Sequence, residues 1–115
     1  MKSPITTHVL DTSQGRPAAG VPAVLAIREP SGAWRDLGLG VTDDDGRIGD
    51  LLAADHALAV GVYRLTFDVA TYFQGQGKET FYPGIAITFE ICAPSEHYHV
   101  PLLLSPYGYS TYRGS

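Results

Sequence analysis

The amino-acid sequence predicts an all-β fold, a sandwich of two sheets with one short helix. Three observations support this prediction. Apolar and polar residues alternate along several short segments, turn signals recur about every ten residues, and little of the chain has helical spacing. Thirteen glycines, eight prolines and seven tyrosines agree with many turns and few long helices.

The predicted strands are the segments in which apolar and polar residues alternate. The clearest is 85–92, where every odd-numbered position is apolar. Because successive side chains of a strand point to opposite faces, these positions share one face. The other predicted strands are 5–11, 22–29, 34–42, 62–69, 98–105 and 107–113.

Two segments have helical features. Segment 70–76 follows a strand and is closed by glycines, so we predict a short helix there. Segment 51–58 has a candidate N-cap in Asp50, but Gly49 and Gly61 bracket it tightly, and we do not favour a helix.

Length and composition limit the function classes. The 115 residues predict one domain, 1–115, and a chain this short favours oligomerisation. Twelve acidic against eight basic residues give a net charge of −4, which excludes the basic stripe of a nucleic-acid-binding protein. The longest nearly apolar run, 18–27, is too short to span a membrane. One cysteine, Cys92, and no secretory signal predict a reducing, cytoplasmic location.

The histidines are the first candidates for chemistry. His97 and His99 lie two apart in a predicted strand and therefore share a face, and His8 lies in the first strand. Three neutral imidazoles around an open water position would suit a hydrolytic zinc site. However, no further ligand pattern or supporting carboxylate is evident, and surface histidines are the plainer alternative.

The segment 43–46 contains three aspartates and a glycine. It resembles part of a calcium loop but lacks the spacing and closing Glu of one. We therefore predict a turn in which Asp side chains accept local hydrogen bonds, with Arg47 at the start of the next segment. Such an arginine is usually solvated. Nothing beside Cys92 in the sequence would activate its thiol, so we expect a structural or incidental role.

The C-terminal segment 107–115 is rich in tyrosine and runs directly on from strand-like residues. This places Arg113, Gly114 and the hydroxyl and carboxylate of Ser115 where they could line a site. The alternative is a last edge strand whose tyrosines only pack.

These segments together resemble the 5-hydroxyisourate hydrolases of the transthyretin-like family. The segment 99–106 (HVPLLLSP), Tyr109 and the end Tyr-Arg-Gly-Ser at 112–115 match the signature of these enzymes. The segments 6–11 (TTHVLD), 42–47 and 61–83 match as well, so the resemblance covers essentially the whole chain. The terminal tetrapeptide separates the hydrolases from the transthyretin hormone carriers of the same fold.

The resemblance implies a transthyretin-like sandwich of two four-stranded sheets with one short helix. It also implies a homotetramer with active sites at the dimer–dimer interface. The reaction would be hydrolysis of 5-hydroxyisourate to 2-oxo-4-hydroxy-4-carboxy-5-ureidoimidazoline in urate degradation, a part of purine metabolism. It would use no metal and no organic cofactor. The alternative is a non-catalytic transthyretin-like protein that binds a small ligand.

The same resemblance implies the site residues. His8, Arg47, His99 and Ser115 would be catalytic, and His8, Arg47 and Tyr112 would bind the substrate. His97 lies outside the family motif. Opening a cyclic amide with water needs a base, an oxyanion donor and an acid for the leaving nitrogen. We expect Arg47 to lie between the two histidines, where its charge favours a neutral imidazole and its planar fork holds the carbonyl.

Overall fold

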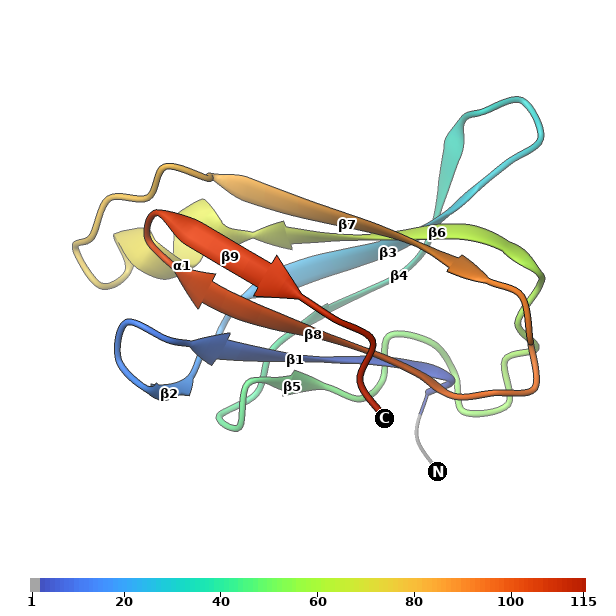
Figure 1. Cartoon of the computed structure of the whole chain (residues 1–115), viewed down its shortest axis with the longest axis horizontal. Helices are drawn as coiled ribbons and strands as arrows, with labels where there is room; N and C mark the ends of the chain where they lie inside the picture. Colours follow the sequence, from blue (N-terminus) through green and yellow to red (C-terminus); the bar gives the residue numbers. More distant parts are fainter. Residues whose placement is uncertain (1–2) are drawn as a thin grey trace.

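Two sheets packed face to face make up the computed structural model of this chain, which describes residues 3–115 (Figure 1). The first sheet has the order β4-β3-β6-β7, and all of its pairs are antiparallel. Its strands are β3 (Pro22–Arg28), β4 (Trp34–Val41), β6 (Gly61–Asp68) and β7 (Gly84–Ile91).

The second sheet runs β2-β1-β8-β9, and β5 pairs with β1 beside this path. The central pair, β1 with β8, is parallel, and the other pairs are antiparallel. The two-residue strands β2 and β5 were not predicted, because two residues are too few for an alternating pattern. The strands are β1 (Ile5–Asp11), β2 (Arg16–Pro17), β5 (Arg47–Ile48), β8 (Tyr98–Ser105) and β9 (Gly108–Thr111).

The core lies between the two sheets. Val9, Leu25, Leu65, Phe67 and Leu102 are all 0% exposed and come from both sheets. In β7 the odd-numbered residues are buried or half-buried, as the alternation predicts. The long strands end within about two residues of their predicted ends. The predicted fold class, an all-β sandwich with one short helix, is therefore confirmed.

The helix α1 (Val69–Gln74) confirms the helix predicted at 70–76, with slightly different ends. It begins earlier because Asp68 caps it: the carboxylate accepts the backbone N–H of Thr71 at 3.1 Å and its hydroxyl at 2.7 Å. Segment 51–58 forms turns, and its leucines pack into the core. Across residues 3–115, no helix combines the length and apolar character needed to cross a membrane.

A buried polar cluster joins α1 to the end of β1. The Asp11 carboxylate is 0% exposed and accepts the Tyr72 hydroxyl at 2.6 Å and the Ser13 backbone N–H at 3.0 Å. Burial acts to raise the pKa of Asp11, but the hydrogen bonds from Ser13 and Tyr72 outweigh it and hold the pKa below its ordinary value. Burial and the hydrogen bond to Asp11 raise the pKa of Tyr72 to about 12.

Candidate active site

The turn at 43–46 positions Arg47. The Asp43 carboxylate accepts the backbone N–H groups of Asp45 and Arg47, both at 2.9 Å. Gly46 has a φ of +76°, and a Cβ there would collide with the carbonyl oxygen of Val9. The Val9 N–H in turn donates to the Gly46 carbonyl at 2.7 Å. The predicted turn is confirmed, and these contacts hold it against β1.

The pairing of β5 with β1 sets Arg47 directly opposite His8. Residues opposite each other in an antiparallel pair project to the same face. Thr6 lies two residues before His8 and shares that face. His8 is half-buried and Arg47 is exposed, so this outer face of the sheet is accessible to a small molecule.

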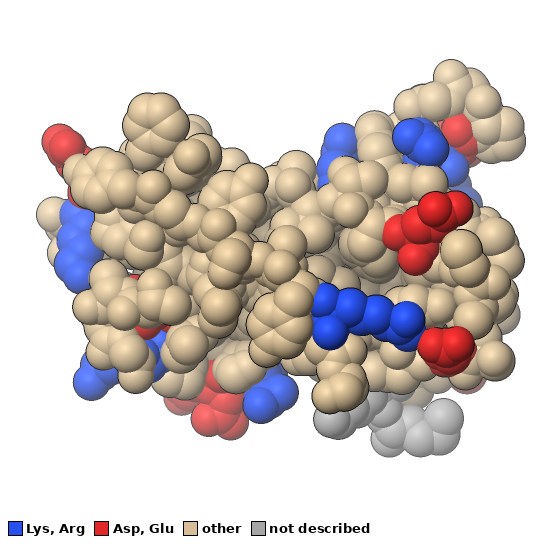
Figure 2. Space-filling view, in the orientation of Figure 1, with Lys and Arg blue, Asp and Glu red and all other residues tan. Residues whose placement is uncertain are grey.

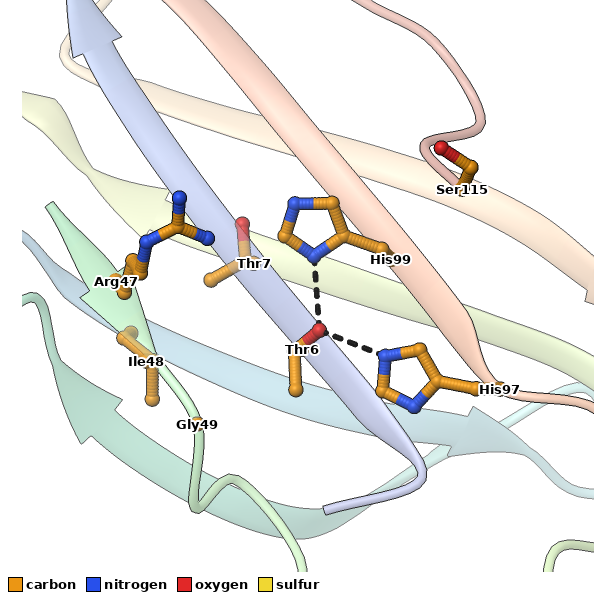
Figure 3. Close-up of a pocket in the computed structure, with 8 residues that line it drawn as sticks. All are labelled: Thr6, Thr7, Arg47, Ile48, Gly49, His97, His99 and Ser115. Atoms are coloured by element: carbon orange, nitrogen blue, oxygen red, sulfur yellow. Dashed lines mark hydrogen bonds between the residues drawn. The ribbon is translucent and has the colours of Figure 1, made fainter. Parts of the chain in front are cut away.

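The parallel pairing of β1 with β8 brings the first strand beside the HVPLLLSP segment. Thr6 and His99 are register partners, and the Thr6 hydroxyl oxygen lies 2.8 Å from Nδ1 of His99. The same oxygen lies 3.1 Å from Nε2 of His97 (Figure 3). One hydroxyl therefore joins two imidazoles. Thr7 points to the other face, where its hydroxyl donates to the Val100 carbonyl at 2.6 Å.

The C-terminal residues are fixed against β8. The backbone N–H of Gly114 donates to the carbonyl of His99 at 2.8 Å. The guanidinium of Arg113 binds the Glu96 carboxylate at 2.8 Å and lies 4.6 Å from the centre of the Tyr98 ring. A Cβ at Gly114 would lie 2.6 Å from Cδ2 of His99. Only glycine fits at position 114, because the backbone there lies against the imidazole. This close approach places Ser115 at the site.

These elements enclose an open hollow of about 230 Å³ (Figure 3). The guanidinium of Arg47 and the ring of His99 reach toward one another from opposite sides of β1, and Ser115 lies beyond His99. The lining combines a planar cation, two imidazoles and hydroxyl groups. The lining residues are Thr6, Thr7, Arg47, Ile48, Gly49, His97, His99 and Ser115.

Three of the site residues predicted from the sequence, Arg47, His99 and Ser115, share this hollow. His8 does not line it but lies on the same sheet face, opposite Arg47. Tyr112 lines a second hollow, of about 340 Å³, that His99 also borders.

The structure adds Thr6 and His97, which were not predicted as site residues. His97 was recognisable from its two-residue spacing to His99, which places both on one face. Thr6 had no such signal, because only the parallel pairing of β1 with β8 places it beside the imidazoles.

His, Cys, Asp and Glu side chains are the candidate metal ligands of the chain. Among the described residues, no group of three or more His, Cys, Asp or Glu side chains is placed to hold a metal ion. Within residues 3–115, the structure therefore does not bring three histidines together as a zinc site would require. Cys92, the single cysteine of the sequence, is exposed and lies just after the end of β7.

Charges on the molecular surface are mixed. On the face shown in Figure 2, basic and acidic side chains are interspersed and form no continuous basic stripe. The permanent cation in the lining of the first hollow is Arg47. A guanidinium fork beside imidazoles and hydroxyls suits a small polar molecule with a carbonyl group.

Fold and site together indicate a transthyretin-like sandwich with a polar site on one sheet face. The model of the HIUase/Transthyretin family matches residues 5–114, and the chain belongs to this family. It is 49% identical over 111 residues to a 5-hydroxyisourate hydrolase of Salmonella dublin, a match that covers 96% of this chain and 80% of that protein.

Solved structures agree with this assignment. The 5-hydroxyisourate hydrolase of Klebsiella pneumoniae has a TM-score of 0.83 and 37% identity, with 96% of this chain and 98% of that chain covered. Transthyretin from Sparus aurata has a TM-score of 0.91 and 32% identity, with 98% and 97% covered. The transthyretin-like fold predicted from the sequence is confirmed.

Proposed function

We propose that this protein, acting as one domain over residues 1–115, hydrolyses 5-hydroxyisourate in urate degradation. The observation that carries the proposal is the convergence of Arg47, His99 and Ser115 on one polar hollow from three distant segments. The Salmonella and Klebsiella relatives, both described as 5-hydroxyisourate hydrolases, support an enzyme with this activity.

The proposed reaction opens a cyclic amide. Water adds to the ring carbonyl carbon, the C–N bond breaks, and the product is 2-oxo-4-hydroxy-4-carboxy-5-ureidoimidazoline. The attacking water loses a proton, and the leaving ring nitrogen gains one. The transition state carries negative charge on the former carbonyl oxygen, so the site needs a base, an oxyanion donor and an acid.

Arg47 supplies the oxyanion donor. Its planar fork provides several N–H donors in a fixed geometry, and the Asp43 turn holds its backbone in place. His99 is the base that takes the proton from water, because it lines the hollow between Arg47 and Ser115. The Ser115 hydroxyl orients the water.

His8 and Tyr112 complete the proposal. His8 shares the sheet face with Arg47 and is assigned to binding the substrate and protonating the leaving nitrogen. Tyr112 borders the neighbouring hollow beside His99 and is assigned to positioning the substrate ring.

We also propose a homotetramer with the sites at the dimer–dimer interface. The site face of β1 and β5 is open in one copy, with Arg47 and Ser115 exposed, so a neighbouring copy would enclose it. Light scattering tests this proposal: a mass of four chains supports it, and a monomer at working concentration would rule it out.

The free, exposed Cys92 supports a reducing compartment such as the cytoplasm.

The second candidate is a non-catalytic carrier of a small ligand. The likeness to Sparus aurata transthyretin favours it, because the backbone similarity is higher than that to the hydrolase structure, with TM-scores of 0.91 and 0.83. The lining argues for the enzyme, since it brings together a guanidinium, imidazoles and a hydroxyl that can act as oxyanion donor, base and acid.

An ultraviolet assay separates the two candidates. Urate oxidase generates 5-hydroxyisourate from urate, and its decay is followed with and without this protein. We expect fast decay with the wild type and with His56→Ala, whose histidine is exposed in the loop between β5 and β6. His99→Ala should reduce the decay to about the spontaneous rate. If 5-hydroxyisourate decays only at the spontaneous rate with the wild type, the non-catalytic carrier would be the remaining candidate.

A further inference from the structure

A single hydroxyl group lies between two histidines at the site. The Thr6 oxygen is 2.8 Å from Nδ1 of His99 and 3.1 Å from Nε2 of His97, both within hydrogen-bonding distance. Thr6 is buried, whereas His97 is exposed. The hydroxyl carries one proton, so it donates to one imidazole and accepts from the other.

The position of the His99 ring is set from two sides. Its Cδ2 edge faces Gly114, where no further atom fits, and its Nδ1 edge faces Thr6. Figure 3 shows the edge of the ring that carries its other nitrogen, Nε2, on the side of the Arg47 guanidinium. A guanidinium has only donors, so a lone pair on Nε2 is favoured on that side. The proton of a neutral His99 then belongs on Nδ1.

The direction of the remaining bonds follows from this placement. Nδ1–H of His99 donates to the Thr6 oxygen, and the Thr6 hydroxyl donates to Nε2 of His97. His97 must then be neutral, with its proton on Nδ1. Protonation of His97 reverses its role, because Nε2–H becomes a donor aimed at Thr6. The Thr6 proton then has His99 Nδ1 as its acceptor, which moves the His99 proton to Nε2.

We propose that Thr6 and His97 are positioning residues that set the tautomer of His99, so that neutral His97 places the His99 proton on Nδ1 and its basic lone pair on Nε2. This inference rests on the proposed function for its kinetic consequence, but the tautomer itself is a property of the free protein. His97 acts only through Thr6 and is not assigned contact with the reacting atoms.

The charged groups around His97 come from several elements. Arg47 of β5, His99 of β8 and Ser115 with its carboxylate line the same hollow, and His8 lies on the same face of β1. The neighbouring Glu96 is paired with Arg113. Histidine is the side chain that changes charge near neutral pH. Protonation of His97 therefore adds a second way to inactivate the base, besides protonation of His99 itself.

Nitrogen-15 NMR of the histidine rings tests the tautomer without substrate. In wild-type protein above neutral pH, we expect His99 to carry its proton on Nδ1 and a lone pair on Nε2. Thr6→Val keeps the side-chain shape but removes the hydroxyl that accepts from Nδ1, and should raise the share of His99 that carries its proton on Nε2. Thr6→Ser should restore the wild-type pattern. A proton on Nε2 of His99 in the wild type, or no change in Thr6→Val, would overturn the proposal.

Steady-state kinetics tests the consequence. General-base catalysis contributes about 10²- to 10⁴-fold, so we expect Thr6→Val to lower kcat about tenfold or more with a smaller change in KM. In His97→Gln the amide oxygen accepts from Thr6 without titrating. We expect this variant to lose less kcat at pH 8 than Thr6→Val does, because the acceptor for the Thr6 hydroxyl is kept.

The pH profile gives the sharpest distinction. We expect the acid limb of log kcat to have a slope above 1 in the wild type and in His56→Gln, and a slope of about 1 in His97→Gln. Equal slopes in all three proteins would overturn the proposal. Loss of hydrolysis in the wild type would refute the proposed function, while the NMR result would still decide the tautomer.

Discussion

The two ends of β1 use polar groups in opposite ways. At its C-terminal end, the Asp11 carboxylate is fully buried and accepts hydrogen bonds from Ser13 and Tyr72. Toward its N-terminal end, Thr6 lines an open hollow with Arg47 and His99, and His8 lies on the same sheet face. The first cluster has its acceptors satisfied and contributes to stability. The second leaves polar groups facing solvent and is the part we assign to chemistry.

Arg47→Lys should produce the largest change at the open end. Lysine keeps the charge but cannot reproduce the planar fork, and losing one oxyanion donor costs about 10²- to 10³-fold in kcat. We expect a loss of about 100-fold in kcat, with the free energy of unfolding unchanged within about 0.5 kcal/mol because the side chain is exposed. Full activity in Arg47→Lys would remove the planar-donor role from the account.

Gly114→Ala should have the next largest effect on activity. The new Cβ would lie 2.6 Å from Cδ2 of His99, so the ring or the tail must move. Displacing a catalytic group by about 1 Å can lower the rate by up to about 100-fold. We expect Gly114→Ala to lower kcat about tenfold. Gly108→Ala is the matched control, since its Cβ meets the Ser105 hydroxyl at 3.6 Å. Only Gly114→Ala should lose activity, and equal losses in both variants would contradict a role for this close approach.

Tyr72→Phe tests the buried end of β1. It removes one hydrogen bond to a buried carboxylate, which costs about 1.5–3 kcal/mol of stability. Activity per folded molecule should not change. Tyr107→Phe, at an exposed tyrosine, is the control and should leave stability unchanged. Denaturant unfolding measures both variants, and an equal stability in Tyr72→Phe and wild type would contradict the assigned role.

The pH dependence of stability sharpens the same contrast. Because the folded-state pKa of Asp11 is lowered, its stabilisation is present above the unfolded-state value and is lost as pH falls through the folded-state value. The stability difference between wild type and Tyr72→Phe should therefore narrow in acid. On the alkaline side, Tyr72 stabilises below pH 10, and this contribution is lost as the pH rises toward 12. A difference that stays constant from pH 7 to acid would contradict this interpretation.

Chelation should have the smallest effect. The described residues contain no group of three or more candidate ligands at one place. We therefore expect exhaustive treatment with a chelator to leave the hydrolysis rate and the unfolding midpoint unchanged. A loss of activity that returns on adding zinc would revive the three-histidine interpretation.

The local structure could be predicted from the sequence further than the site could. Alternation gave the long strands, and the acidic turn before Arg47 was recognisable from its residue types. The order of the strands in each sheet could not be predicted, because alternation shows which face of a sheet a residue takes but not which strands are neighbours. The position of Thr6 beside His99 depends on the parallel β1–β8 pair, and that of Ser115 depends on the fit of Gly114 against the imidazole.

The resemblance supplied the site residues that local pattern could not. Arg47, His99 and Ser115 meet in one hollow, whereas Tyr112 borders the neighbouring one. The sequence pointed to His97 only through its spacing to His99. Its contact with Thr6 was not predictable, because it joins segments that are far apart in the sequence.

The number of 5-hydroxyisourate molecules consumed per protein molecule tests the central claim most directly. The protein is mixed with a large excess of freshly generated 5-hydroxyisourate, and the consumption above the spontaneous decay is counted. Catalysis by the open end of β1 predicts many equivalents consumed, at a rate proportional to protein concentration. Consumption that stops at one equivalent or less per site would show binding without turnover and would contradict the account.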